Sequence, residues 1–335
     1  MKAYLEKLGK RWYLPLGAVF LVYPFVVNTY WVDVANFFGI YTLLGLSLNI
    51  IVGHAGLYNL GHAAFYAVGA YSTAILNTVF HVPILLLLPV SALLAALAGY
   101  LVSKPILHLR GDYLAIVTIG FGEIMRIALN NNPFNLTGGP NGIMGIGRPE
   151  LFGFRVYLPI HYYFFIWLLV VVVIFALKRL ENSRIGRAWN YIREDELAAE
   201  AMGIDTTRMK VLAFVMGAAL AGVAGNIYAS KVTVIAPESF GFWESVVMFS
   251  IIVLGGPGSI PGVLVGTLGM FVLPEIFRGF ASARMLVFGL AMMLMMVFRP
   301  EGLWPSQRYR QAVRDSDEEL GAVRGAKTAP GSLKG

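Results

Sequence analysis

Runs of about 20 mostly apolar residues recur along most of this 335-residue chain. A run of that length can cross a hydrocarbon core roughly 30 Å thick as an α-helix. The composition agrees, because 57% of the residues are hydrophobic and only 13% are charged, whereas about 25% of the residues in soluble domains are charged. The chain is therefore predicted to be an all-α, polytopic integral membrane protein in contact with the lipid bilayer.

About ten transmembrane helices are predicted, some of them broken or re-entrant. The first runs over residues 12–31, with Trp12 and Trp31 at its ends, as is typical of aromatic residues at a membrane interface. Two glycine-rich stretches, at 53–61 and 255–262, each separate a pair of helices, and either pair could instead be one broken helix. The other nine helices are expected near residues 38–57, 62–79, 84–103, 112–130, 161–179, 211–230, 243–256, 263–278 and 283–298.

The basic residues predict which way these helices run. If the amino terminus is cytoplasmic, twenty of the 26 Lys and Arg residues lie in the inner segments 1–11, 104–111, 178–210 and 299–335. Cytoplasmic loops carry such an excess, so both termini are predicted to lie in the cytoplasm, in agreement with an even number of helices. The net charge of +7 then belongs to the inner face and does not indicate nucleic-acid binding.

Several kinds of catalytic or cofactor site find no support in the sequence. The stretch 255–262 lacks the Lys that a Walker A loop carries after its last Gly. The chain contains no Cys, and His54 and His62 have no nearby carboxylate or thiol to complete a metal site. We therefore expect a chain that is not an enzyme and that binds neither a metal nor a cofactor.

Polar residues interrupt the apolar sequence around the first glycine-rich stretch. A break in a helix is tolerated inside a membrane only where its backbone faces protein or water, and transporters often bind substrate at such breaks. The polar residues are therefore candidates to line a translocation path, with close packing through the neighbouring small residues as the alternative. They are Asn49, His54, Tyr58, Asn59 and His62.

A pair of opposite charges lies in the predicted helix 112–130. Glu123 and Arg126 are three residues apart, so they share one face of the helix and can pair. Charged side chains at that depth are costly and usually face a cavity or the interior of a helix bundle. The two residues are further candidates for the translocation path, and the alternative, which we favour, is a structural ion pair.

The longest polar segment between helices, about 181–210, is predicted to contain a short surface helix. Asp195 can cap the start of this helix, and Gly203 suits the position after its end. Asp205 or Thr206 can cap the following helix. Such a surface helix is either a solvated connector or a plug for a groove on a soluble partner.

On the outer side the longest loop, about 131–160, contains the turn-forming sequence Gly-Gly-Pro-Asn-Gly. A loop of this length is often functional. It either docks an external protein or is a plain surface loop. The candidate docking residues are Thr137, Gly138, Gly139, Asn141 and, just before the predicted helix 243–256, Glu238.

Several of these segments together resemble the membrane permeases of ABC importers for branched-chain amino acids, specifically the LivM-type subunit. The similarity includes Gly-His-Ala-Gly and Gly-His-Ala-Ala-Phe within 53–69 and Gly-Phe-Gly-Glu-Ile within 113–126. Four further stretches are similar, 136–142, 187–204, 254–262 and 299–304. Together the similar stretches cover most of residues 40–304.

The resemblance implies a permease subunit of an ATP-driven importer in the inner, or cytoplasmic, membrane that takes up leucine, isoleucine and valine. The implied partners are a second, related permease subunit, two ATP-binding subunits that hold ATP and Mg²⁺, and a periplasmic or lipid-anchored solute-binding protein. Related permeases carry urea, short amides or other amino or carboxylic acids, which are therefore the alternative cargoes. An ion-driven secondary transporter is a further alternative.

The resemblance also implies that the surface helix is a coupling helix, which contacts an ATPase. Such helices often carry Glu-Ala-Ala, then three residues, then Gly; here Ala198, Ala199 and Gly203 fit, while Leu197 stands where the Glu would be. Residues 1–304 would form the permease domain, with the coupling segment at about 181–210, and 305–335 would be a disordered cytoplasmic tail. The candidate coupling residues are Arg193, Glu194, Glu196, Ala198, Ala199, Glu200 and Gly203.

Overall fold

The computed structural model describes residues 13–109, 111–151, 154–276, 289, 293, 297–299 and 302–305. This part of the chain is mostly helical and holds six helices long and apolar enough to cross a membrane. The prediction of an all-α polytopic membrane protein is confirmed at that level, whereas ten helices and cytoplasmic termini stay predictions. Most of the predicted helix 283–298, and the predicted tail beyond residue 305, lie outside the described residues.

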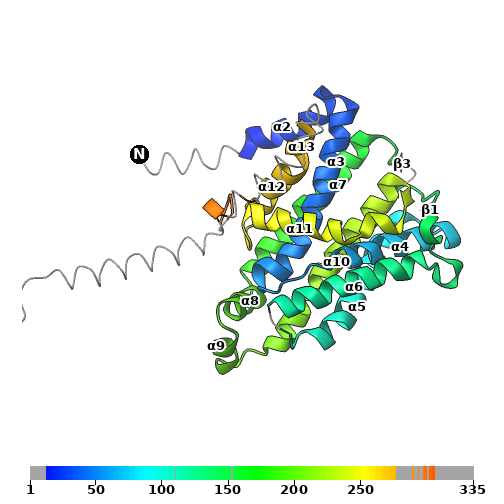
Figure 1. Ribbon diagram of the computed structural model, residues 1–335. Helices are drawn as coiled ribbons and strands as arrows, with labels where there is room; N and C mark the ends of the chain where they lie inside the picture. Colours follow the sequence, from blue (N-terminus) through cyan, green and yellow to red (C-terminus); the bar gives the residue numbers. More distant parts are fainter. Residues whose placement is uncertain are drawn as a thin grey trace, which may run out of the picture.

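Helices form nearly all of the described structure (Figure 1). Five predicted helices match observed ones to within a few residues at their starts: 62–79 matches α4, 84–103 α5, 112–130 α6, 161–179 α7 and 211–230 α10. Along the chain the main helices are α2 (Tyr13–Val26), α3 (Thr29–Asn49) with the π-helical turn η1 (Ile50–His54), α4 (Ala63–Phe80), α5 (Ile84–Ile106), α6 (Asp112–Asn130), α7 (Pro159–Glu181), α8 (Arg184–Glu194), α9 (Glu196–Ala201), α10 (Thr206–Val232), α11 (Phe242–Gly255), α12 (Ile260–Thr267), the π-helical η5 (Leu268–Val272) and α13 (Leu273–Ile276).

The prediction of one helix over 12–31 is wrong at its carboxyl end. α2 ends at Val26, and Asn28 has φ −59° and ψ 149°, which are not helical angles. The amide of Trp31 donates a hydrogen bond to the carbonyl oxygen of Asn28 at 2.9 Å, so Trp31 already belongs to the next helix. α3 therefore starts nine residues before the predicted position 38, because only the polar residues Asn28 and Thr29, with neither Gly nor a charge, mark the break.

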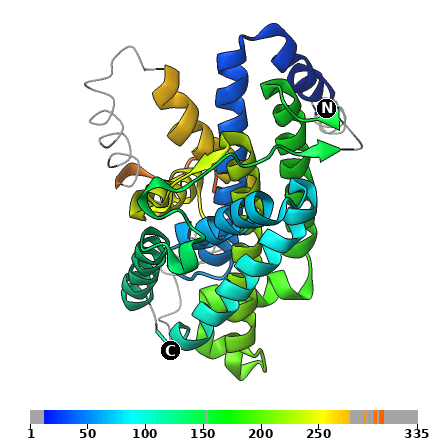
Figure 2. The same ribbon diagram turned by 90° about the vertical axis from the view of Figure 1, so that its right-hand side faces the viewer.

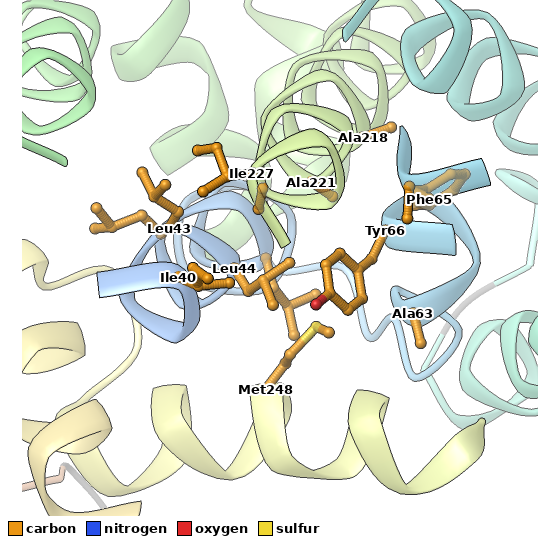
Figure 3. Packing of buried hydrophobic residues seen from close by; sticks show 14 of the residues in the cluster. Ile40, Leu43, Leu44, Ala63, Phe65, Tyr66, Ala218, Ala221, Ile227 and Met248 are labelled. Atoms are coloured by element: carbon orange, nitrogen blue, oxygen red, sulfur yellow. The ribbon is translucent and has the colours of Figure 1, made fainter. Parts of the chain in front are cut away.

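α10 runs through the middle of the bundle and packs against α3, α4 and α5. Small residues let these helices approach closely: a Cβ added at Gly69 of α4 would lie 2.3 Å from the carbonyl oxygen of Gly222 in α10. Figure 3 shows Tyr66 of α4 directed toward Leu44 of α3 and Met248 of α11. The core is one continuous apolar cluster, to which α3, α4, α5, α7, α10 and α11 all contribute buried residues.

Two Gly→Ala substitutions, one at the contact of α4 with α10 and one outside it, are expected to change stability in opposite directions. Gly69→Ala is expected to destabilise the protein by about 1–3 kcal/mol, because the new methyl group would overlap the α10 backbone. Gly120→Ala, in α6, has no neighbour within 4 Å and should stabilise its helix by about 1 kcal/mol. Thermal unfolding in detergent measures both, and an unchanged midpoint for Gly69→Ala would contradict the packing.

The bundle has two distinct ends (Figures 1 and 2). At one end, here called the α9 end, lie α8 and α9. At the other, here called the strand end, β1 (Ile143–Met144) pairs antiparallel with β4 (Val234–Ile235), and β2 (Glu150–Leu151) pairs with β3 (Phe154–Arg155). Three short helical turns also lie in these connections, η2 (Pro133–Asn135), η3 (Gly139–Asn141) and η4 (Pro237–Phe240).

Candidate functional site

The glycine-rich stretch after α3 separates two helices, as predicted. Beyond η1 the chain is irregular until α4 begins at Ala63. It turns back toward the last turn of α3, since Nε2 of His62 lies 2.7 Å from Oγ of Ser47. Glycine is required at position 61, because a Cβ there would lie 1.9 Å from the carbonyl oxygen of Thr118 in α6. The break is thus packed inside the protein between α3 and α6.

Two of the predicted path residues form a buried network within this break. Asn59 and His62 are both almost completely buried. Nδ1 of His62 lies 3.3 Å from Nδ2 of Asn59, and Oδ1 of Asn59 accepts a hydrogen bond from the amide of Gly61 at 3.0 Å. These contacts satisfy polar groups that the irregular backbone would otherwise leave unpaired. Tyr58 is exposed by contrast.

The other two predicted path residues of this stretch have different partners. Oδ1 of Asn49 accepts a hydrogen bond at 2.9 Å from the amide of Gly258, in the second glycine-rich stretch. Nε2 of His54 lies 3.4 Å from Oε1 of Glu181, at the end of α7. The structure therefore does not gather the five polar residues into one site, and His54 and His62 are not neighbours in a common cluster.

The second glycine-rich stretch forms a tight turn between α11 and α12. A Cβ at Gly255 would lie 2.0 Å from the carbonyl oxygen of Gly262, so the two helices touch backbone to backbone. The amide of Trp304 donates to the carbonyl oxygen of Gly255 at 2.9 Å. Because Asn49 bonds to Gly258, the two glycine-rich breaks, far apart in the sequence, lie side by side. Sequence reasoning identified each break but not their contact.

Glu123 and Arg126 pair as their spacing predicted, with Nε of Arg126 2.9 Å from Oε2 of Glu123. Nη1 of Arg126 also donates to Oε1 of Glu238 at 2.7 Å, so a path candidate and a docking candidate meet. The Glu238 side chain is 73% exposed. Ion pairs at such exposure contribute at most about 1 kcal/mol, so this cluster is a surface feature that ties α6 to η4.

The long loop at the strand end is ordered by its own polar side chains. Thr137 is buried, and its Oγ1 donates to the carbonyl oxygen of Leu129 at 2.8 Å. Oδ1 of Asn132 accepts from the amides of Thr137 and Gly138 at 2.9 and 3.0 Å. Among the predicted docking residues Gly139 is buried, whereas Asn141 and Glu238 are exposed. Phe134 and Met144, which were not predicted, are exposed by 92% and 66%.

A carboxylate inside an apolar helix was missed by the sequence reasoning. Oε2 of Glu244, in α11, accepts a hydrogen bond from the hydroxyl of Tyr41 in α3 at 3.0 Å. Ionisable residues in membrane-spanning helices commonly mark functional positions. The signal was visible, because Glu244 is a lone acid within the predicted helix 243–256. A second such contact joins Nζ of Lys231 to Oδ1 of Asp33 at 2.7 Å.

At the α9 end the predicted surface helix is present as α9. Oδ1 of Asp195 accepts from the amides of Leu197 and Ala198 at 2.9 and 3.1 Å, and Gly203 follows the helix with φ +82°. Asp205 caps α10. The predicted caps are confirmed. The preceding helix α8 was missed, although Ser183, which caps it, gave a signal in the sequence.

α9 is fixed to the bundle by one face and open on another. Ala199 is fully buried, and the acid Glu196 pairs with Nζ of Lys210 at the start of α10, at 2.5 Å. Oε1 of Glu200 accepts from Oγ1 of Thr206 at 2.7 Å. The part of α9 that is not packed, here called the open face, carries Leu197, and Met202 follows the helix directly; the two are exposed by 65% and 63%. The exposed surface is thus more apolar than the candidate coupling residues suggested. Two of those candidates, Glu196 and Glu200, make contacts within the chain instead.

Comparison with known proteins identifies relatives along most of the chain. The family model described as branched-chain amino acid transport system / permease component matches residues 30–298. The high-affinity branched-chain amino acid transport system permease proteins LivM of Salmonella typhimurium and Escherichia coli K12 are each 42% identical, over 89% of this chain and 76% of their own length. The LivH permease protein of Salmonella typhimurium is 29% identical, over 78% of this chain and 90% of its own. No solved structure matches.

Both the extent of the family match and the identity to the LivM proteins exceed what a shared helical composition alone produces. The matched region contains both glycine-rich breaks and the α9 end described above. The chain therefore belongs to the family of permease components of branched-chain amino acid transport systems.

Proposed function

We propose that this chain is the LivM-type permease subunit of an ATP-driven importer for leucine, isoleucine and valine in the inner membrane. The names of its relatives support the cargo class. The chain itself supplies the transmembrane part, with about ten helices and both termini in the cytoplasm, and hydrolyses no ATP. The α9 end then faces the cytoplasm, and the strand end faces the periplasm.

The observation that carries the energy-coupling part of this proposal is the open face of α9. Leu197 and Met202 are exposed apolar side chains beyond the ends of the membrane-crossing helices, next to the charged residues Glu194 and Asp195. An apolar patch rimmed by charge, outside the membrane, fits a groove on a soluble protein. We assign that groove to two ATP-binding subunits, which bind ATP and Mg²⁺ and move the permease by closing.

The proposal includes two further partners. A second permease subunit is supported by the similarity of this chain to LivM and LivH proteins alike. A solute-binding protein, periplasmic or lipid-anchored, docks at the strand end, where Phe134, Met144, Asn141 and Glu238 are exposed. Transport proceeds by alternating access, in which the helices rearrange as rigid bodies about the two glycine-rich breaks. Asn49 and His54, at the first glycine-rich break, are proposed to line the path, whereas Glu123 and Arg126 are proposed to form a structural ion pair that ties α6 to η4.

Competition for uptake tests the cargo. The two permease subunits and the two ATP-binding subunits are reconstituted in proteoliposomes with ATP inside. Labelled leucine and the solute-binding protein are added outside. Unlabelled isoleucine and valine in tenfold excess are expected to reduce leucine uptake by about tenfold, because they share one carrier. Urea and acetamide should leave it unchanged. Uptake of urea that leucine does not inhibit would assign the chain to the amide carriers instead.

A further inference from the structure

The side chain of Arg193 points away from the open face of α9 and into the two glycine-rich breaks. Its Nη1 donates a hydrogen bond to the carbonyl oxygen of Gly53, in η1, at 2.5 Å. A Cβ built at Gly258 in the second break would lie 3.0 Å from the same Nη1. A Cβ built at Gly56 would lie 2.9 Å from Cγ of Arg193. One side chain thus reaches both breaks at once.

The carbonyl oxygens at the end of η1 favour a positively charged donor such as the guanidinium of Arg193. The last carbonyl oxygens of a helix have no partner within the helix and carry partial negative charge, and Gly53 belongs to the last turn of the helix that α3 begins. The guanidinium is a planar donor group that stays charged in proteins, and burial lowers the pKa of Arg193 from its ordinary value. The carbonyl oxygen of Gly53 thus holds one nitrogen of the guanidinium, while other parts of Arg193 are open to water.

The same residue lies close to α9 along the chain. A single residue, Asp195, separates α8 from α9 and caps α9. α8 is in turn held on α10, because Nε1 of Trp189 donates to the carbonyl oxygen of Met209 at 2.7 Å. A displacement of α9 can therefore reach Arg193, which lies three residues before the start of α9. Asn49 joins the breaks to each other through Gly258, so a force at Gly53 reaches both.

We infer that Arg193 is a positioning residue that links α9 to the two glycine-rich breaks, so that movement of α9 reorients α3 and α11. This inference rests on the proposed function, in which ATP-binding subunits move α9. The family resemblance placed Arg193 among the residues that contact the ATPase. Its side chain instead contacts the glycine-rich breaks. Arg193 touches the moving helices, and Leu197 and Met202 touch the partner.

The test compares Arg193→Gln with Arg208→Gln in the complete, reconstituted complex. Arg208 is a matched control because it lies at the same end and its side chain is 84% exposed and pairs with Asp205, three residues before it. For Arg193→Gln we expect normal assembly with the ATP-binding subunits and basal ATP hydrolysis within about twofold, while leucine taken up per ATP falls about tenfold. Arg193→Lys, which keeps a charged donor, should recover part of that loss. Arg208→Gln should match the wild type in every measurement.

An unchanged leucine-to-ATP ratio for Arg193→Gln would overturn the inference. So would a variant that assembles poorly with the ATP-binding subunits but whose assembled complexes transport leucine normally. If neither the wild type nor Arg208→Gln takes up leucine with ATP, the proposed function itself fails, which is a separate outcome.

A disulfide supplies a second test that compares one polypeptide with itself. A Cβ at Gly56 would lie 3.3 Å from Cβ of Arg193, near the roughly 3.8 Å of a disulfide, and the chain has no Cys of its own. Gly56 has φ +71°, so a Cys there is strained, but the reduced and oxidised forms share that strain. Gly56→Cys/Arg193→Cys should have a low leucine-to-ATP ratio when reduced and recover when oxidised, because the covalent bond replaces the lost contact. Equal ratios in the two states would contradict a rigid link.

Discussion

Leu197→Asp is expected to weaken binding of the ATP-binding subunits by roughly 30-fold, or about 2 kcal/mol, while the helical bundle stays folded. Leu197 is 65% exposed on α9, so an aspartate there disturbs no contact within the chain. It would place a charge in the apolar groove that the proposal assigns to the ATPase. Co-purification of the permease with the ATP-binding subunits from membranes measures the loss directly.

Met144→Asp is the matched control for Leu197→Asp. Met144 is 66% exposed but lies in β1, at the opposite end of the bundle. This variant should keep its ATP-binding subunits, and any defect should appear in the response to the solute-binding protein. If both variants lose the ATP-binding subunits to the same degree, the open face of α9 is not the docking surface.

Glu196→Gln is expected to detach α9 from the bundle. The side chain of its partner Lys210 is only 5% exposed and that of Glu196 21% exposed, and removal of one member of a buried ion pair costs about 3–5 kcal/mol. We expect a lower midpoint of thermal unfolding, faster proteolysis within residues 195–205 and loss of ATP-driven uptake.

Two further variants test the reason for that loss. Glu196→Gln/Lys210→Met removes both charges and should recover most of the stability, since replacing a whole buried pair with apolar groups is often neutral. Glu194→Gln changes an exposed acid in the same segment and should leave stability unchanged. A double variant as unstable as Glu196→Gln would show that the carboxylate itself, and not the unpaired ammonium, matters.

Most helices could be predicted because their signal is local. The predicted ranges 62–79 and 112–130 differ little from α4 and α6, since length, apolarity and flanking glycines decide them. The caps Asp195 and Asp205 were readable for the same reason. The break at Asn28 was not, because neither Gly nor an unfavourable charge marks it and its geometry depends on how α2 packs.

The parts of the candidate site that depend on long-range contacts could not be read from spacing. The contact of Asn49 with Gly258 and that of Arg193 with Gly53 join residues more than a hundred positions apart. The burial of Ala199 depends on how α9 lies on α10, so local sequence alone does not show which face of α9 is buried. Short strands such as β1 and β4 carry two residues each and have no periodic pattern.

The source of energy for uptake tests the central claim most directly. Proteoliposomes containing the complete complex are loaded with ATP and Mg²⁺ or left without nucleotide, and are then exposed to proton or sodium gradients, with labelled leucine and binding protein outside. Leucine should accumulate only with internal ATP, and ionophores that collapse the gradients should have no effect. Accumulation of leucine by the permease alone, driven by an ion gradient without any ATP-binding subunit, would contradict the account.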